Sequence, residues 1–235
     1  MKIDRVRLTQ LEGVLEHADP FWEERLVRPV DIYPEHKAEG AHWTPMDGPG
    51  RYQIEAVFVE VDTDAGVTGL GGPITPDQGA IISRQMASLV VGEDPWASER
   101  IWDKIYRSQV HGRGGAAMMA LSALDCALWD LKGKLAGVPV YRLLGGPTRT
   151  EIPAYASALG YSLEPARVRE RAGKIVEEGY RATKWFFRHG PLDGPEGIRK
   201  NLELARTLRD AVGDDVDIML DCWMSWDVPY TIDMA

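Results

Sequence analysis

Residues 120–146 read ALSALDCALWDLKGKLAGVPVYRLLGG, and this stretch decides the fold of the chain. Apolar residues recur there at intervals of three and four, which is the spacing of one face of an α-helix. The repeat predicts one long helix from about residue 114 to residue 135, carried by Ala117, Leu121, Leu124, Leu128, Leu131 and Leu135. Gly137 is a typical helix stop, and Val138-Pro139 prevents the helix from continuing. Asp125 and Asp130 lie on this helix five positions apart, so we interpret them as structural.

Upstream of this helix the chain changes from an extended to a helical pattern. Residues 1–11, 53–61 and 67–70 have strand character and predict a small antiparallel sheet with a hairpin at 62–66. A helical region begins at Thr75-Pro76, and a further helix begins at Asp94-Pro95. Residues 13–52 form a long excursion between the first two strands. Because loops of that length in compact domains are usually functional or disordered, and this one is rich in aromatic residues, we expect a functional segment.

Downstream the pattern becomes an alternation of strands and helices. We predict strands at 151–156, 181–187 and 216–220, separated by helices at 165–178 and 195–212. The spacing between strand starts is that of βα units, and right-handed crossovers would place the three strands parallel and side by side. Such a sheet must continue into a doubly wound sheet or a barrel. The chain stops at what looks like the start of a third helix, so we expect a truncated protein.

Composition excludes several classes of function. Lysine and arginine number 27 and acidic residues 36, which gives a formal net charge of −9 and argues against a nucleic-acid binder. The sequence has no apolar run long enough for a membrane span and no signal-peptide pattern at its start. Its two cysteines form no disulfide framework or metal-ligand spacing. We therefore expect a cytoplasmic globular protein with no nucleic-acid or membrane partner.

Two charged residues in the alternating region carry the strongest chemical signal. Asp221 follows the third predicted strand, at the carboxyl edge where α/β sheets and barrels place their sites, and its carboxylate suits a hard cation such as Mg²⁺. The alternative is a helix cap or a loop hydrogen bond. Lys184 lies among aromatic residues in the second strand, where it either points into a site or extends outward to solvent. Arg188 and His189 follow at the mouth of that strand, and His189 is a candidate acid or base or a surface residue.

The excursion contributes a second set of candidates. His36, His42, Trp43 and Arg51 are polar and aromatic residues suited to a carboxylate or a polyol, although such residues more often lie on a surface without a role. The usual nucleotide-binding and hydrolase motifs are absent from the sequence. The nearest approach, Gly69-Leu-Gly-Gly72, has neither the third glycine nor the helix of a dinucleotide site.

Residues 120–146 resemble the enolase superfamily in its mandelate racemase/muconate lactonizing enzyme subgroup, and the resemblance covers nearly the whole chain. Within the subgroup the likeness is closest to the acid-sugar dehydratases, and it is carried by residues 219–225 with Asp227-Val228 and by residues 189–200. It implies an α+β N-terminal capping domain over residues 1–146. It also implies that residues 147–235 are the first three βα units of an α/β modified TIM barrel of the (β/α)7β type.

The resemblance also assigns roles to residues. It implies that Asp221 is the first of three carboxylate ligands of Mg²⁺, and that the other two ligands belong to the fourth and fifth barrel strands. Racemases of the subgroup carry Lys-x-Lys at the end of the second strand. Here Lys184 is kept but the second position is Phe186, which cannot move a proton, so a two-base racemase using that lysine is disfavoured. Trp223 replaces an asparagine that is common two positions after the first ligand.

The reaction implied is abstraction of the proton next to the carboxylate of an acid sugar. Mg²⁺ and Lys184 would stabilise the resulting enediolate, and a general acid would expel the β-hydroxyl to give a 2-keto-3-deoxy sugar acid. We expect Lys184 and His189 to be catalytic. We expect the loop at 17–52 to close over the substrate, and the side chains that contact the substrate to be His42, Trp43, Arg51, Arg188 and Trp223.

We also expect a homo-oligomer. Two alternatives stay open. One is a racemase, epimerase or cycloisomerase of the same superfamily, and the other is a non-catalytic fragment that binds a partner or oligomerises through helices at 76–137.

Overall fold

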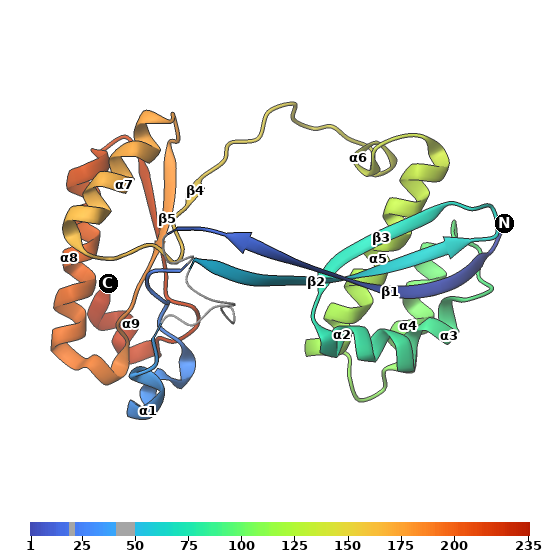
Figure 1. Ribbon diagram of the computed structural model, residues 1–235, viewed down its shortest axis with the longest axis horizontal. Coiled ribbons are helices and arrows are strands. Elements are labelled where there is room, and N and C mark those ends of the chain that lie inside the picture. Colours follow the sequence, from blue (N-terminus) through green and yellow to red (C-terminus); the bar gives the residue numbers. More distant parts are fainter. Residues whose placement is uncertain (19–21, 41–49) are drawn as a thin grey trace. The chain divides into compact units, whose positions relative to one another are not determined.

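The computed structural model describes residues 1–18, 22–40 and 50–235, shown in Figure 1. By their contacts these residues form two compact units. The first comprises Met1–Val14 and Gln53–Thr150, and the second comprises Leu15–Tyr52 and Glu151–Ala235. The division after Thr150 lies close to the domain boundary that the sequence predicts after residue 146. The excursion belongs by its contacts to the second unit, whereas the sequence prediction counts it with the first domain.

The first unit contains the three-stranded sheet that the sequence predicts. Its strands are β1 (Ile3–Glu16), β2 (Arg51–Thr63) and β3 (Thr68–Ile74), in the order β1-β2-β3. The hairpin between β2 and β3 is antiparallel and pairs Val61 with Gly69. Both β1 and β2 are longer than their apolar runs suggested. Polar pairs extend across them, including Arg7 Nε to Asp62 Oδ2 at 2.6 Å and Thr9 Oγ1 to Glu60 Oε2 at 3.2 Å.

The helices of the first unit follow the sheet in sequence. They are α2 (Pro76–Ile81), a π-helical turn (Ile82–Met86), α3 (Ala87–Val90), α4 (Ser98–Ser108), α5 (Gly115–Ala136) and α6 (Val140–Leu143). The long helix is confirmed, and it ends as predicted at Gly137, whose φ of +67° is left-handed. Apolar residues of β1–β3 and the helices form one core, with fully buried members Val59, Ile82, Met86, Ile101, Leu124, Leu128 and Leu131.

Helix α5 packs directly against β3, and two glycines make this approach possible. A Cβ added at Gly71 would lie 2.2 Å from the carbonyl oxygen of Ala123, and one at Gly69 would lie 2.1 Å from that of Ala127. Asp130 Oδ2 accepts a hydrogen bond from the backbone N–H of Leu70 at 2.8 Å, which joins the same two elements. The glycines therefore serve helix–strand packing, and the structural interpretation of Asp130 is confirmed.

The second unit contains a parallel sheet covered by helices. Its elements are β4 (Ala156–Ser157), α7 (Pro165–Glu177), β5 (Ala182–Phe186), α8 (Gly194–Val212), β6 (Asp217–Asp221) and α9 (Val228–Met234). The strands lie in the order β4-β5-β6 and pair in parallel, as predicted. The strand expected at 151–156 is limited to Ala156–Ser157, the two residues that pair with β5.

The excursion runs beside the carboxyl ends of β4 and β5. It contains a 3-10 turn (Pro29–Ile32) and helix α1 (Pro34–Lys37). The N–H of Glu23 donates to the carbonyl of Gly160 at 2.8 Å, and the N–H of Val27 donates to that of Phe187 at 2.9 Å. Both acceptors follow a strand of the parallel sheet, so the described part of the excursion lies at the edge where a site is expected. In the described part of the chain, no helix is both long and apolar enough to cross a membrane.

The glycine contact between α5 and β3 yields a stability prediction. We expect Gly71→Ala to lower the free energy of unfolding by about 3 kcal/mol, because the helix must move away from the strand to admit a methyl group. Urea unfolding followed by circular dichroism measures the change. Gly13→Ala in β1 is the matched control, since a Cβ there meets nothing within 4 Å. Equal unfolding midpoints for the two variants would contradict the packing explanation.

Candidate active site at the carboxyl edge of the parallel sheet

Lys184 and Asp221 lie on one face of the parallel sheet. The register pairs Lys184 with Met219 and Phe186 with Asp221, so these four side chains project to the same side. Their neighbours Trp185 and Leu220 project to the other side, into the core that α7 and α8 cover. The structure thus places Lys184 on the face away from the helices, and Asp221 on that same face at the carboxyl end of β6.

The two charged groups are close enough to interact. Lys184 Nζ lies 3.7 Å from Asp221 Oδ2, with 23% of the lysine side chain and 27% of the aspartate side chain exposed. The other oxygen, Asp221 Oδ1, accepts the backbone N–H of Trp223 at 2.9 Å. Lys184 Nζ also lies 5.5 Å from the ring centre of Tyr155. Asp221 therefore makes the loop hydrogen bond of the simpler interpretation and still presents one oxygen beside a cation.

The turn after β6 is held firmly and carries Trp223 at its tip. Trp223 and Met224 have φ values of +48° and +56°, an unusual backbone conformation for residues other than glycine. Trp223 is 54% exposed. On the far side of the turn, the Trp226 ring stacks on Phe187 with 4.7 Å between centres, and its Nε1 donates to the carbonyl of His189 at 3.0 Å. The exposed indole of Trp223 thus stands two residues from Asp221 on a fixed turn.

His189 lies in the connection between β5 and α8 and pairs with a different carboxylate. Its Nδ1 is 3.5 Å from Asp193 Oδ1, and Asp193 Oδ2 in turn accepts Lys37 Nζ at 2.6 Å. Burial lowers the pKa of His189, despite the opposing effect of Asp193. Burial by itself raises the pKa of the Asp193 carboxyl. The hydrogen bonds from Lys37 and from the backbone of Gly190 outweigh burial, so the pKa is lowered. In the described residues the His189 imidazole thus lies beside Asp193, and it has no ion pair with Asp221.

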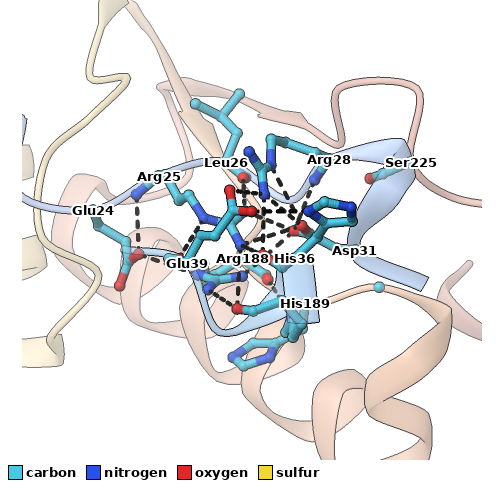
Figure 2. Close-up of polar contacts among 12 residues, drawn as sticks. Glu24, Arg25, Leu26, Arg28, Asp31, His36, Glu39, Arg188, His189 and Ser225 are labelled. Carbon is cyan, nitrogen blue, oxygen red and sulfur yellow. Dashed lines mark hydrogen bonds and ion pairs between the residues drawn. The ribbon is translucent and has the colours of Figure 1, made fainter. Parts of the chain in front are cut away.

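Arg188 belongs to a cluster of charges that joins the excursion to β5. Its Nε donates to Glu24 Oε1 at 3.2 Å, and its Nη2 donates to the carbonyl of Lys37 at 3.0 Å. Its Nη1 lies 3.6 Å from Asp31 Oδ2. Figure 2 shows these side chains converging, and the structure engages the Arg188 guanidinium within the protein. Its predicted contact with substrate stays a prediction.

Asp31 is the centre of this cluster. Arg25 donates to it through two nitrogens, at 2.7 and 3.2 Å, and the N–H of Arg28 donates at 3.0 Å. Only 3% of the Asp31 side chain is exposed. Burial opposes ionisation of this carboxyl, but the hydrogen bonds from Arg25 and from the backbone of Arg28 prevail and lower its pKa. A single buried carboxylate thus satisfies several donors from one short segment.

The remaining predicted residues come from the excursion. Arg51 begins β2, with its Nε 3.9 Å from Glu16 Oε1. His36 Nδ1 lies 2.8 Å from Glu39 Oε1, which makes it a member of the charged cluster. His42 and Trp43 lie outside the described residues, and their proposed contacts with substrate stay predictions.

Sequence reasoning missed Asp31, Arg25 and Asp193. Their signal was weak, because isolated charged residues in an irregular segment resemble solvated surface residues. The stretch Arg25-Leu-Val-Arg-Pro-Val-Asp31 did contain a clue, in that apolar Leu26 and Val27 stand between two arginines. Both apolar residues are buried, and the arginines flank an anchored segment.

The donor set fits part of a site for a hard cation. Asp221 offers carboxylate oxygen on a partly solvated face, which is the ligand type that Mg²⁺ takes. In the described ranges, no cluster of three or more histidine, cysteine, aspartate or glutamate residues could hold a metal ion. Among the residues proposed from the sequence, Asp221 is the one whose side chain has the chemistry of a ligand for such a cation, and its metal role stays a prediction.

Comparison with known proteins identifies relatives for both parts of the chain. Residues 46–145 match the family described as mandelate racemase / muconate lactonizing enzyme, N-terminal domain. Residues 167–235 match the enolase C-terminal domain-like family. A curated relative named putative L-rhamnonate dehydratase, from Caldivirga maquilingensis, is 38% identical over 87% of this chain and 48% of its own length.

Two solved structures show the same fold. The L-rhamnonate dehydratase from Gibberella zeae superposes with a TM-score of 0.75 and 29% identity, over 99% of this chain and 54% of that one. A racemase from Streptomyces coelicolor A3(2) with bound magnesium gives a TM-score of 0.71 and 26% identity, over 99% and 58% of the two chains. This chain thus spans about half the length of these relatives. The predicted fold is confirmed as an N-terminal domain followed by part of a C-terminal domain of this type.

The buried charges of the second unit predict a pH dependence of stability. The pKa of His189 is lowered on folding, so its contribution to stability is present above about pH 6.5 and falls as the pH drops from there toward the folded-state pKa. Asp31 and Asp193 also have lowered pKa values. Their contribution is present above about pH 4 and is lost as the pH falls through their folded-state values.

We therefore expect the unfolding temperature to fall in two steps between about pH 8 and about pH 2. Differential scanning calorimetry at several pH values measures these steps. His189→Gln should remove the upper step and leave the lower one. An upper step of unchanged size in this variant would contradict the assignment.

Proposed function

The chain belongs to the mandelate racemase/muconate lactonizing enzyme family of the enolase superfamily, and from that premise we propose that its protein is an acid-sugar dehydratase. The observation that carries the proposal is the juxtaposition of Lys184 and Asp221 on the inner face of the parallel sheet, the face away from the helices. Relatives named L-rhamnonate dehydratase support the substrate class. The reaction proposed is a hydro-lyase reaction that converts a sugar acid into a 2-keto-3-deoxy acid.

Asp221 would contribute one carboxylate ligand to Mg²⁺ in the complete site. A bound Mg²⁺ would supply positive charge to the substrate carboxylate and so make the neighbouring proton more acidic. This assignment is supported by the position of Asp221 at the carboxyl edge and by the magnesium bound in the Streptomyces coelicolor racemase. The hydrogen bond from the Trp223 N–H to Oδ1 would hold the carboxylate in orientation.

Lys184 would provide a second positive charge next to the substrate. Its ammonium group lies on the same face as Asp221, where it could stabilise the negative charge that develops on the substrate carboxylate as the proton leaves. Phe186 lies directly opposite Asp221 in the register and cannot exchange a proton. Within the described strand β5, the inner face thus carries one proton-exchanging side chain, which favours elimination over a reaction that needs bases on both sides of the same carbon.

The rest of the protein would serve this site. We propose that the first unit caps the site, that the parallel sheet belongs to a modified TIM barrel, and that Trp223 contacts the distal part of the sugar acid. We further propose a homo-oligomer. His189, held by Asp193, is retained as a candidate acid or base, although its contacts separate it from Lys184 in the described structure.

A racemase or epimerase is the second candidate. It is favoured by the racemase from Streptomyces coelicolor among the structural relatives and by the presence of Lys184. The two functions differ in whether water is lost. In D2O, a racemase would exchange the proton next to the carboxylate and return the same compound or its epimer, whereas a dehydratase would yield the 2-keto-3-deoxy product.

We predict that Asp221→Asn strongly reduces dehydration. With the protein expressed from its complete gene, L-rhamnonate and other acid sugars are assayed for 2-keto-3-deoxy products with and without Mg²⁺. We expect kcat/KM to fall by about 100-fold or more in the variant, because transition-state charge loses its electrostatic support. Isothermal titration calorimetry should show weaker Mg²⁺ binding.

Asp217→Asn is the matched control for this experiment. Asp217 lies on the same strand and face at the opposite end of β6 and is exposed. We expect this variant to keep both activity and Mg²⁺ affinity. Unchanged turnover in Asp221→Asn, or an equal loss in Asp217→Asn, would count against the metal role of Asp221.

A further inference from the structure

The charged cluster around Asp31 gathers three cations on one buried carboxylate. Three guanidinium groups, those of Arg25, Arg28 and Arg188, lie within 3.6 Å of its carboxylate oxygens. Two of them come from the excursion and one comes from the end of β5 (Figure 2). Asp31 is therefore the point at which the excursion and the parallel sheet share one counter-ion.

Arg25 also joins the two ends of the segment 25–39 through hydrogen bonds. Besides Asp31, its guanidinium donates to the carbonyls of Leu26, His36, Lys37 and Glu39, at distances between 2.8 and 3.2 Å. Those carbonyls include the last two of the short helix α1, which lack partners inside the helix. Because only 7% of Arg25 is exposed, these bonds are shielded from water. Residues 25–39 are thereby bound into one compact piece with Asp31 and Arg25 at its centre.

A second set of contacts binds this piece to the sheet. Lys37 Nζ reaches the carbonyl of Arg188 at 2.9 Å and Asp193 Oδ2 at 2.6 Å. Val27 is 1% exposed and belongs to the core of the second unit with Phe187. A Cβ added at Gly190 would lie 3.0 Å from the Cγ2 methyl of Val27, so the backbone approaches this side chain closely. The piece is thus fixed by both apolar and charged contacts.

The fixed piece is one backbone residue away from the candidate site. The N–H of Phe187 donates to the carbonyl of Asp221 at 2.9 Å, and the carbonyl of Phe187 accepts the N–H of Val27 at 2.9 Å. A displacement of residues 25–39 would therefore be transmitted through Phe187 to the end of β6. Residues 25–39 are therefore a fixed part of the carboxyl edge of the sheet, which we call the wall, and these contacts do not describe a freely moving loop.

We infer that Asp31 is a positioning residue, which fixes residues 22–39 as a rigid wall beside Lys184 and Asp221 through Arg25, Arg28 and Arg188. The inference rests on the proposed function for its catalytic consequence, since it assumes that substrate binds at this edge. Its structural part is independent of any reaction. Asp31 touches no reacting atom in this arrangement and acts through the segment that it holds.

The test compares Asp31→Asn with Asp62→Asn in the protein expressed from its complete gene. Asp62 is a matched control because its carboxylate also accepts from two arginines, Arg5 and Arg7, but lies in the first unit. Hydrogen–deuterium exchange is measured on both variants. In Asp31→Asn we expect peptides from 22–39 to exchange at least about 10-fold faster while 182–186 stays protected, because the asparagine cannot balance three cations.

Kinetics with the best acid-sugar substrate form the second readout. We expect Asp31→Asn to raise KM by about 10-fold with a smaller change in kcat, because the wall orients substrate and does not take part in proton transfer. Asp62→Asn should change neither KM nor exchange in 22–39. A purely structural role would lower the amount of active enzyme and leave KM unchanged, so this split distinguishes positioning from folding.

The outcomes separate the two proposals. Unchanged exchange in 22–39 overturns the inference, and so does faster exchange with an unchanged KM, because the segment would then be no wall of the site. If the wild-type protein turns over no acid sugar, the proposed function fails, and the catalytic consequence inferred for Asp31 fails with it. The exchange experiment still decides whether Asp31 fixes residues 22–39. Should Asp31→Asn not fold, Arg28→Gln takes its place, since 33% of the Arg28 side chain is exposed and its loss is less severe.

Discussion

Phe187 connects the elements on which the candidate site depends. Its N–H binds the carbonyl of Asp221, which prolongs the pairing of β5 with β6 to the residue that would hold the metal. Its carbonyl binds Val27, and its ring stacks on Trp226. Strand, excursion and the turn after β6 therefore meet at one residue. Because a backbone hydrogen bond in a buried setting is costly to leave unmade, these three segments are constrained to move together.

The regular elements could be predicted from the sequence because their signals are local and repetitive. The leucine repeat of α5, its stop at Gly137 and the alternation that produced β5, α8 and β6 all depend on the burial of one face. The same pattern singled out Lys184, a charge within an aromatic strand, and the position directly after a predicted strand singled out Asp221. The two-residue length of β4 could not be predicted, because it depends on pairing with β5 and not on residues 151–156 themselves.

The arrangement of the excursion was beyond sequence reasoning for a different reason. Its contacts join residues far apart in the chain, Lys37 with Asp193 across 156 positions and Glu24 with Arg188 across 164, through side chains that normally face water. No periodicity marks such pairs. The sequence suggested a loop that closes over substrate, and that closure stays a prediction. What the structure shows is that residues 22–39 are held beside the sheet by the ion pairs Lys37–Asp193 and Glu24–Arg188 and by the buried Val27. The aromatic content favoured an ordered segment over disorder, but it could not identify Asp31 as its centre.

The distribution of charge at this edge bears on how the proposed anionic substrate would be held there. This chain carries a net charge of −9, which by itself would repel a sugar acid at long range. The cations of the excursion and of the end of β5 do not offset this, because each is opposed by a nearby carboxylate: Arg25, Arg28, Lys37 and Arg188. On the inner face, Lys184 is likewise balanced by Asp221. A divalent cation at Asp221 would make this face locally positive, so the metal would be needed to hold the substrate as well as to activate it. Because the surrounding cations are already paired with carboxylates, they would not compete with the metal for the substrate carboxylate. Their ion pairs would instead hold the neighbouring segments in place around the metal.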